Sequence, residues 1–281
     1  MTEYEFAANR QPLASSDNQP TDKLSYWEAF RNHRGILTNF IKRQSPPFSD
    51  SLCVLGAGFC NDLDLNELAA NFQQLTLVDI AKKDLSLGLR QQDLSESESL
   101  KIVGDYDVTG VHDLFLKFQE SQERSDLESL VTEMESFHPS GLGVFDSVAS
   151  TCLLSQLMFH AYESVTEGHE RFVEILQKVR LQHIRVMLDL IKPGGVGFLF
   201  TDFVSSESLP ELFTTRNLKE TVENAIAERN FLHGLNPTMV ARVFEEPEVK
   251  SELKNIKVTD PWRWVLPERI YACFGIIFEK R

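Results

Sequence analysis

The chain is short of positive charge. Its 281 residues include 28 Lys and Arg against 42 Asp and Glu, which gives a formal net charge of −14. Proteins that bind nucleic acid contact its phosphates through Lys and Arg, so this deficit argues against a nucleic-acid partner. The same deficit argues against an anionic membrane surface. It favours a neutral or cationic small molecule as the ligand.

Cysteine is also scarce. The chain has Cys53, Cys60, Cys152 and Cys273, and no two of them form a C-x-x-C pair. Three of the four lie in or beside apolar runs, so we expect reduced, buried thiols in a cytoplasmic protein. The seven histidines show no metal-binding spacing beside a carboxylate, and we predict no metal site.

Long apolar runs are absent as well. No segment approaches the roughly 20 apolar residues that cross a membrane, and the polar N-terminus lacks the pattern of a signal peptide. We expect residues 1–23 to be a disordered tail. Apolar residues at helical spacing predict an N-terminal helical cap over 24–48. Residues 49–281 are expected to form the main domain.

From residue 52 onward, strand patterns alternate with helical patterns. We predict strands at "LCVLG", "LTLVDI", "LKIVGDYDV", "GVFDSVAST" and "VGFLFTDF", and the clearest helix at 169–191. The chain closes with "WRWVLPERIYACFGIIFEK", which is typical of two strands joined by a short turn. Strands separated by helices predict an α/β fold with a doubly wound, mostly parallel sheet. In such sheets, ligands bind outside the carboxyl ends of the strands.

Three features should meet at that edge of the sheet. Gly56-Ala57-Gly58 follows the first strand, where small residues allow a tight turn and close approach of a ligand. Asp79 ends the second strand, near the roughly 20 positions after the first glycine at which an acid grips ribose hydroxyls. Asp105 follows the third strand, where a carboxylate could reach an adenine amino group. Together, the three features favour an adenosine-type ligand.

Residues 52–279 resemble a class I S-adenosylmethionine-dependent methyltransferase. "VLGAG" is similar to the family's glycine motif, "LTLVDI" to its ribose-binding motif, and "VGDYDV" to the motif beside the adenine. "FDSVAST" resembles the motif at the mouth of the methyl-transfer site, and "IKPGGVGFLF" resembles the helix end and fifth strand. The resemblance implies a seven-stranded, Rossmann-like methyltransferase fold with a C-terminal antiparallel hairpin. It also implies S-adenosylmethionine as the cofactor and a small molecule as the methyl acceptor, at nitrogen or oxygen.

The resemblance also implies a set of cofactor-binding residues. They are Gly56, Ala57, Gly58, Asn61, Asp79, Ile80, Asp105, Tyr106 and Ser150. The sequence departs from the family at Val54, where an acid is common, and at Cys60, where a third glycine is common. The loss of that glycine counts against a dinucleotide more than against S-adenosylmethionine, which has no phosphate.

No catalytic residue is assigned by the sequence. Ser150, Gln156, His160 and Tyr162 lie on or after the fourth strand, and His160 and Tyr162 are the candidates for proton transfer. The N-terminal cap offers Tyr26, Trp27, Arg31 and Arg34 as candidates for substrate contacts. Structural roles are open for all of these residues. His183 is expected to be a half-buried structural histidine, and Trp262 and Trp264 to pack one face of the hairpin.

Two alternatives stay open. An NAD(P)-dependent oxidoreductase would also use the glycine turn and Asp79, although the final hairpin speaks against it. A methyltransferase-like protein that binds a ligand or partner without catalysis is the third hypothesis. The sequence leaves a homodimer open and does not identify the acceptor.

Overall fold

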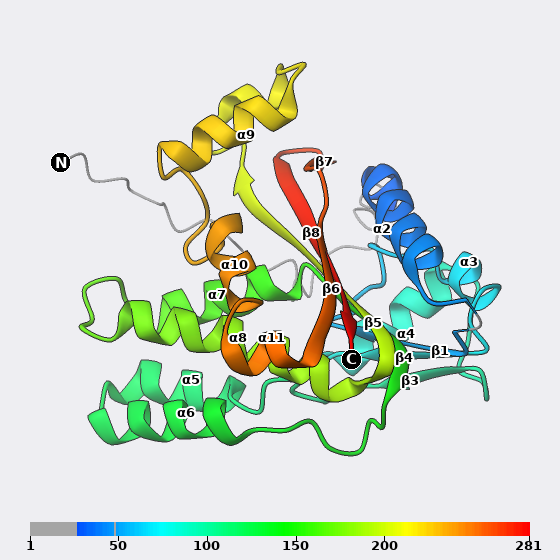
Figure 1. The fold of residues 1–281 in the computed structure, drawn as a ribbon, viewed down its shortest axis with the longest axis horizontal. Coiled ribbons are helices and arrows are strands. Elements are labelled where there is room, and N and C mark those ends of the chain that lie inside the picture. Colours follow the sequence, from blue (N-terminus) through cyan, green and yellow to red (C-terminus); the bar gives the residue numbers. More distant parts are fainter. Residues whose placement is uncertain (1–26, 48) are drawn as a thin grey trace.

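The computed structural model describes residues 27–47 and 49–281, and these form one mixed sheet with helices on both faces (Figure 1). The predicted tail and residues 24–26 of the cap lie outside the described residues. The strands are β1 (Ser51–Leu55), β2 (Gln74–Val78), β3 (Leu100–Val103), β4 (Phe145–Thr151), β5 (Ile191–Ser205), β6 (Leu253–Val258), β7 (Trp262–Val265) and β8 (Ile270–Lys280). Their order in the sheet is β3-β2-β1-β4-β5-β8-β6, and β7 also pairs with β8.

The predicted fold class is confirmed. Strands β1 to β5 are parallel, and β8 runs antiparallel to β5, as the closing hairpin predicted. This is the Rossmann-like methyltransferase arrangement that the resemblance implied. Eight strands are present where seven were expected, because β6 and β7 both pair with β8, β6 near its end and β7 near its start. β6 gives a weak sequence signal because five of its six residues are not buried.

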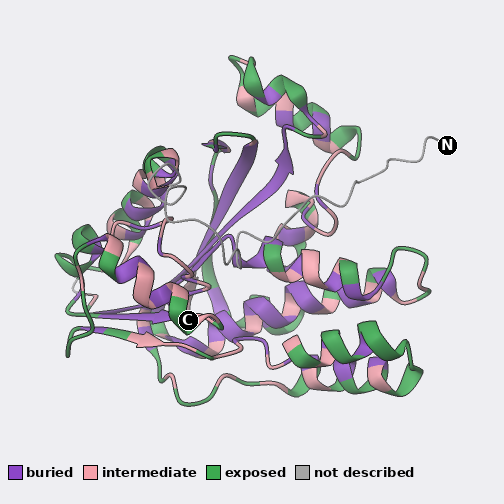
Figure 2. Ribbon diagram, turned by 180° about the vertical axis from the view of Figure 1, so that it is seen from behind, coloured by how far each residue is buried: buried purple, intermediate pink, exposed green. Residues whose placement is uncertain are grey.

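Two groups of helices cover the sheet. One face carries α2 (Arg31–Gln44), α3 (Leu65–Ala69) and α4 (Lys82–Gln91). The other carries α5 (His112–Ser121), α6 (Arg124–Ser136), α7 (Leu153–Ser164), α8 (Phe172–Leu190), α9 (Leu218–Ala227), α10 (Pro237–Val243) and α11 (Pro247–Glu252), with the short 3₁₀ helix η1 (Pro210–Phe213). Figure 2 shows the sheet as the most buried layer between them.

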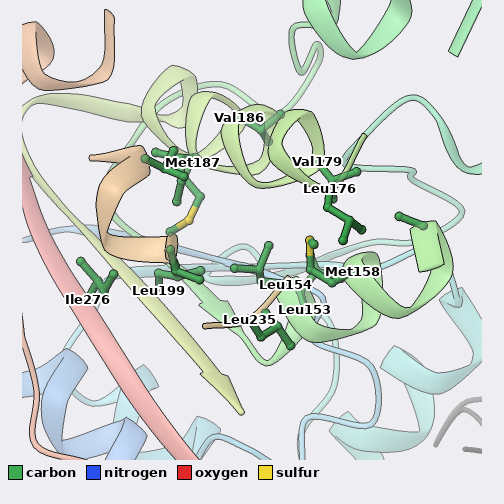
Figure 3. Packing of buried hydrophobic residues seen from close by; sticks show 14 of the residues in the cluster. Leu153, Leu154, Met158, Leu176, Val179, Val186, Met187, Leu199, Leu235 and Ile276 are labelled. Carbon is green, nitrogen blue, oxygen red and sulfur yellow. The ribbon is translucent and has the colours of Figure 1, made fainter. Parts of the chain in front are cut away.

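The larger core lies between the sheet and α7 and α8. Leu154 and Met158 of α7 face Leu176 of α8, and Leu199 of β5 closes the same cluster (Figure 3). These side chains are almost completely buried. Since burying a Leu or Met side chain contributes about 1.5–3 kcal/mol, this cluster fixes α7 against the end of β4. No helix in the described part of the chain is both long and apolar enough to cross a membrane.

The cap helix α2 is bound to the main domain. Arg34 is buried, and its Nη1 donates to the backbone oxygens of Trp27 and Asn61, both at 3.1 Å. Its guanidinium also lies 3.4 Å from the centroid of the Trp27 ring. Arg31 is exposed and pairs with Glu28. Of the cap candidates, Trp27 and Arg34 therefore have structural contacts, and Tyr26 lies outside the described residues.

Candidate functional site

A cavity of about 340 Å³ lies at the carboxyl ends of the parallel strands. Gly56, which follows β1, and Asp79, which follows β2, line one end of it. Cys152 lies in the middle, directly after β4, and Asp202 of β5 and Tyr271 of β8 line the other end. Open α/β sheets bind ligands at this edge. The cavity is therefore the candidate site.

The glycine turn is held by the end of β2. The backbone N–H groups of Gly56 and Ala57 donate to the carbonyl of Val78, at 2.9 and 3.2 Å, and Gly58 N donates to Asp79 Oδ2 at 2.8 Å. Gly56 has φ +68°, and a Cβ there would lie 2.8 Å from Leu153 Cβ. Glycine is thus required at this position by the left-handed backbone and by the close packing of α7.

Asp79 has the position predicted for a ribose-binding acid. Its Oδ1 accepts a hydrogen bond from Ala81 N at 2.8 Å, and its Oδ2 accepts the bond from Gly58. Each carboxylate oxygen has two lone pairs, so the group keeps capacity for ligand hydroxyls. Ile80 lines the cavity beside it and is about half exposed.

No helix begins directly after the glycine turn. The loop continues through Cys60, and α3 starts only at Leu65. The side chain of Asp64 caps this helix by accepting from Glu67 N at 2.9 Å. Because a carboxylate already occupies the N-terminus of α3, that end of the helix does not attract a pyrophosphate. This arrangement differs from the dinucleotide-binding turn.

The loop after β3 brings a different acid to the cavity from the one predicted. Tyr106 and Asp107 line the cavity, whereas Asp105 is exposed, has φ +55° and is not among the lining residues. Asp107 accepts hydrogen bonds from Thr109 N and Oγ1 at 2.8 and 2.6 Å and from His112 N at 2.8 Å. These bonds fix the loop at the start of α5.

Four other predicted residues do not line the cavity: Ala57, Gly58, Asn61 and Ser150. The backbone oxygen of Asn61 accepts from Arg34, and its side-chain oxygen accepts from Gln91 at 3.3 Å. Ser150 is completely buried, and its Oγ shares a hydrogen bond of 2.8 Å with His183 Nε2. His183 is also completely buried rather than half-buried, and burial lowers its pKa to about 4.

Helix α7 forms one wall of the cavity with Ser155, Gln156 and His160. The His160 ring stacks on His112, with centroids 5.0 Å apart. Within the described residues, its buried Nε2 has no hydrogen-bond partner. Burial and the nearby His112 lower the pKa of His160, so the ring is neutral at neutral pH.

The second candidate base lies elsewhere. Tyr162 does not line the cavity, and its ring stacks on His233 with centroids 4.2 Å apart. Of the two residues considered for proton transfer, the fold thus brings only His160 to the cavity.

The far end of the cavity contains residues that the sequence did not indicate as site residues. Asp202, Trp264, Arg269 and Tyr271 line it. The only sequence signal was the alternation of Trp262 and Trp264, which the structure confirms as two buried side chains on one face of β7. Asp202 gave no separate signal because it follows the apolar run of β5.

Metal binding finds no support in the described chain, where no group of three His, Cys, Asp or Glu side chains is placed to hold an ion. The four cysteines are free and buried.

Comparison with known proteins gives distant structural likenesses. No family model and no curated protein matches the chain. NodS, an N-methyltransferase from Bradyrhizobium japonicum WM9 in complex with S-adenosyl-L-homocysteine, is 12% identical with a TM-score of 0.45, over 97% of this chain and 93% of that chain. ChlM, the magnesium protoporphyrin IX methyltransferase from Synechocystis PCC 6803, is 10% identical with a TM-score of 0.45, over 95% and 90%. At these values the likenesses assign no activity to this chain.

Proposed function

We propose that this chain binds S-adenosylmethionine and transfers its methyl group to a small molecule. The observation that carries the proposal is one continuous cavity with two different ends. One end has the glycine turn and Asp79, which suit an adenosine. The other end, beyond β4, has aromatic and carboxylate side chains that suit a second ligand. A transferase needs both ligands in one space.

The residues present fit this cofactor. Asp79 is available for the ribose hydroxyls, and Ile80, Tyr106 and Val108 offer apolar and aromatic surface for the adenine. The capped start of α3 disfavours the pyrophosphate of NAD(P) but does not affect a cofactor without phosphate. When bound, S-adenosylmethionine supplies an electrophilic methyl group on a sulfonium. We therefore prefer it to the oxidoreductase alternative.

The chain's own contribution is orientation and the exclusion of water. Leu153, Phe115 and Val179 give the middle of the cavity an apolar lining. Such a lining lowers the local dielectric constant around two reactants and holds them in contact. The neutral ring of His160 in the same lining is the candidate group for accepting a proton from the acceptor.

The first test is calorimetric titration with S-adenosyl-L-homocysteine. We expect micromolar binding to the unaltered protein and at least tenfold weaker binding to Asp79→Ala. Asp93→Asn is the matched control, because Asp93 is an exposed acid that does not line the cavity. NAD is titrated in parallel. Binding of NAD in place of S-adenosyl-L-homocysteine would overturn the proposal in favour of the oxidoreductase.

A second measurement separates an enzyme from a binding protein. S-adenosyl-L-[methyl-³H]methionine is incubated with the protein and a panel of amines, phenols and carboxylates. Transfer to one class supports the enzyme. Tight cofactor binding without transfer to any class would favour the non-catalytic alternative.

A further inference from the structure

The far end of the cavity is a separate subsite. We define the β5–β8 subsite as Cys152, Asp202, Trp264, Arg269 and Tyr271, all of which line the cavity. In the sheet, β1 and β2 lie on one side of β4, and β5 and β8 lie on the other. The β5–β8 subsite is therefore on the opposite side of β4 from the glycine turn. A ligand held there would meet the cofactor over β4.

Trp264 presents a buried hydrogen-bond donor without an acceptor. The residue is 5% exposed, and among the described residues its Nε1 has no hydrogen-bond partner. A buried polar group left unpaired costs about 1–3 kcal/mol. Trp262, two residues earlier on the same face, does have an acceptor, at 3.1 Å. The unpaired indole N–H in the cavity lining thus calls for an oxygen or nitrogen lone pair on a ligand.

The charge of the lining favours a cation. Asp79, Asp107, Glu163 and Asp202 contribute four carboxylates, and among the described lining residues Arg269 contributes the sole guanidinium. The Arg269 side chain forms an ion pair with Glu207 and donates to Tyr271 Oη at 3.1 Å. Its charge is therefore already compensated. An anionic ligand would meet an excess of carboxylates in this space.

Within the β5–β8 subsite, carboxylate and aromatic surface lie together. Asp202 is 4% exposed, and the rings of Trp264 and Tyr271 lie with centroids 5.2 Å apart and an interplanar angle of 32°. An ammonium group is stabilised both by a carboxylate and by the face of an aromatic ring. This combination suits a compact organic cation.

We propose that the β5–β8 subsite binds the methyl acceptor, and that the acceptor is a small aliphatic amine that also carries a hydroxyl or carbonyl oxygen. This inference rests on the proposed function. The ammonium group pairs with Asp202, and the oxygen accepts from Trp264 Nε1. Water reaches the cavity past the exposed Ile80 and Glu163 and takes one proton from the ammonium. The nitrogen lone pair then forms the N–CH₃ bond while the S–CH₃ bond breaks, and sulfur keeps the bonding pair.

The test measures binding of three compounds of equal size by NMR titration, with and without saturating S-adenosyl-L-homocysteine. The compounds are 3-amino-1-propanol, butylamine and 3-hydroxypropionate. We expect the amino alcohol to bind at least about fivefold more tightly than butylamine, which is the effect of one hydrogen bond of about 1 kcal/mol. We expect no binding of 3-hydroxypropionate.

Two variants locate the contacts. Asp202→Asn should weaken binding of both amines at least tenfold. Trp264→Phe should remove the difference between the amino alcohol and butylamine and leave butylamine binding unchanged. Both variants should keep the affinity of the protein for S-adenosyl-L-homocysteine.

Failure of this inference is distinguishable from failure of the proposed function. Preferential binding of 3-hydroxypropionate, or unchanged amine binding in both variants, would overturn the amine subsite while cofactor binding stands. If Asp202→Asn does not fold, the Trp264→Phe comparison still decides. Loss of all S-adenosyl-L-homocysteine binding by the unaltered protein would instead refute the proposed function.

Discussion

The indole N–H of Trp262 donates to Nδ1 of His33, at 3.1 Å, across 229 positions of sequence. His33 is buried, and its ring also stacks on Trp264 with centroids 4.7 Å apart. Its Nε2 lies 3.2 Å from Asp62 Oδ1, in the loop that follows the glycine turn. One imidazole of the cap helix α2 thus connects that loop to β7 at the far end of the cavity.

The protonation of His33 is subject to opposing effects. Burial lowers its pKa, but hydrogen bonds to Asp62 and Cys152 raise it to about 9. A charged ring would carry a proton on Nδ1 and could not accept from Trp262. The Trp262 hydrogen bond therefore favours the neutral ring with its proton on Nε2, and we assign this form on the geometry of that bond.

Trp262→Phe should destabilise the protein more than Trp264→Phe. Both substitutions remove a buried indole from β7, so the loss of apolar contact is similar. Only Trp262→Phe breaks a hydrogen bond and leaves buried Nδ1 of His33 unpaired, which adds about 1–2 kcal/mol. Urea unfolding of the two variants measures the difference. Equal midpoints would show that the His33 bond does not stabilise the cap helix.

Gly56→Ala should destabilise the protein more than Gly58→Ala. Both glycines have positive φ, so each alanine introduces backbone strain of about 1–2 kcal/mol. A Cβ at Gly56 would also lie 2.8 Å from Leu153 Cβ, whereas at Gly58 the nearest atom is Asp79 Oδ2 at 3.9 Å. Overpacking adds about 1–3 kcal/mol at Gly56. Thermal unfolding of both variants tests this order, and a Gly58→Ala that is the less stable one would contradict the packing.

His160→Phe should impair ligand binding, and Tyr162→Phe should not. The two residues lie on one helix, but only His160 lines the cavity and has a buried ring nitrogen without a partner in the described chain. Phenylalanine preserves the stacking on His112 and removes only the ring nitrogens. We expect about a fivefold or greater loss in kcat/KM for methyl transfer. Equal effects of the two substitutions would contradict the assignment of the α7 wall.

The sequence predicted the elements that depend on local pattern and missed contacts that depend on their assembly. Apolar periodicity located β1 to β5 because each of these strands is largely buried. β6 was missed because one edge of β8 supports it, without an apolar face of its own. Asp202 and Tyr271 join the cavity only because β8 returns antiparallel beside β5, so that Ser205 pairs with Tyr271.

Single-residue shifts explain the differences near the cavity. Side chains alternate along β4, and this turns Ser150 toward His183 beneath the sheet edge, while Cys152, in a left-handed conformation, lines the cavity. Positive φ at Asp105 similarly changes the direction of the chain, and Asp107 rather than Asp105 lines the cavity. Motif spacing locates a loop, but the backbone angles within it decide which carboxylate enters the site.

Acid should destabilise the protein through His183. Its pKa is about 4 in the folded chain against 6.5 for an ordinary histidine, because burial disfavours the charged ring. Between pH 6.5 and 4 the unfolded chain binds a proton that the folded chain does not. Stability is therefore complete above pH 6.5 and falls by roughly 3 kcal/mol as the pH approaches 4. Burial also lowers the pKa of His160 and His233, which adds in the same direction.

His183→Asn tests this titration. The variant removes the ionisable ring, so its urea midpoint should fall less steeply between pH 6.5 and 4 than that of the unaltered protein, whatever its stability at pH 7. His138→Asn is the control, because His138 is largely exposed and bonds to Asp189 at the surface. Its pH dependence should match that of the unaltered protein. A His183→Asn curve parallel to the unaltered one would mean that the buried imidazole is not the group that makes folding sensitive to acid.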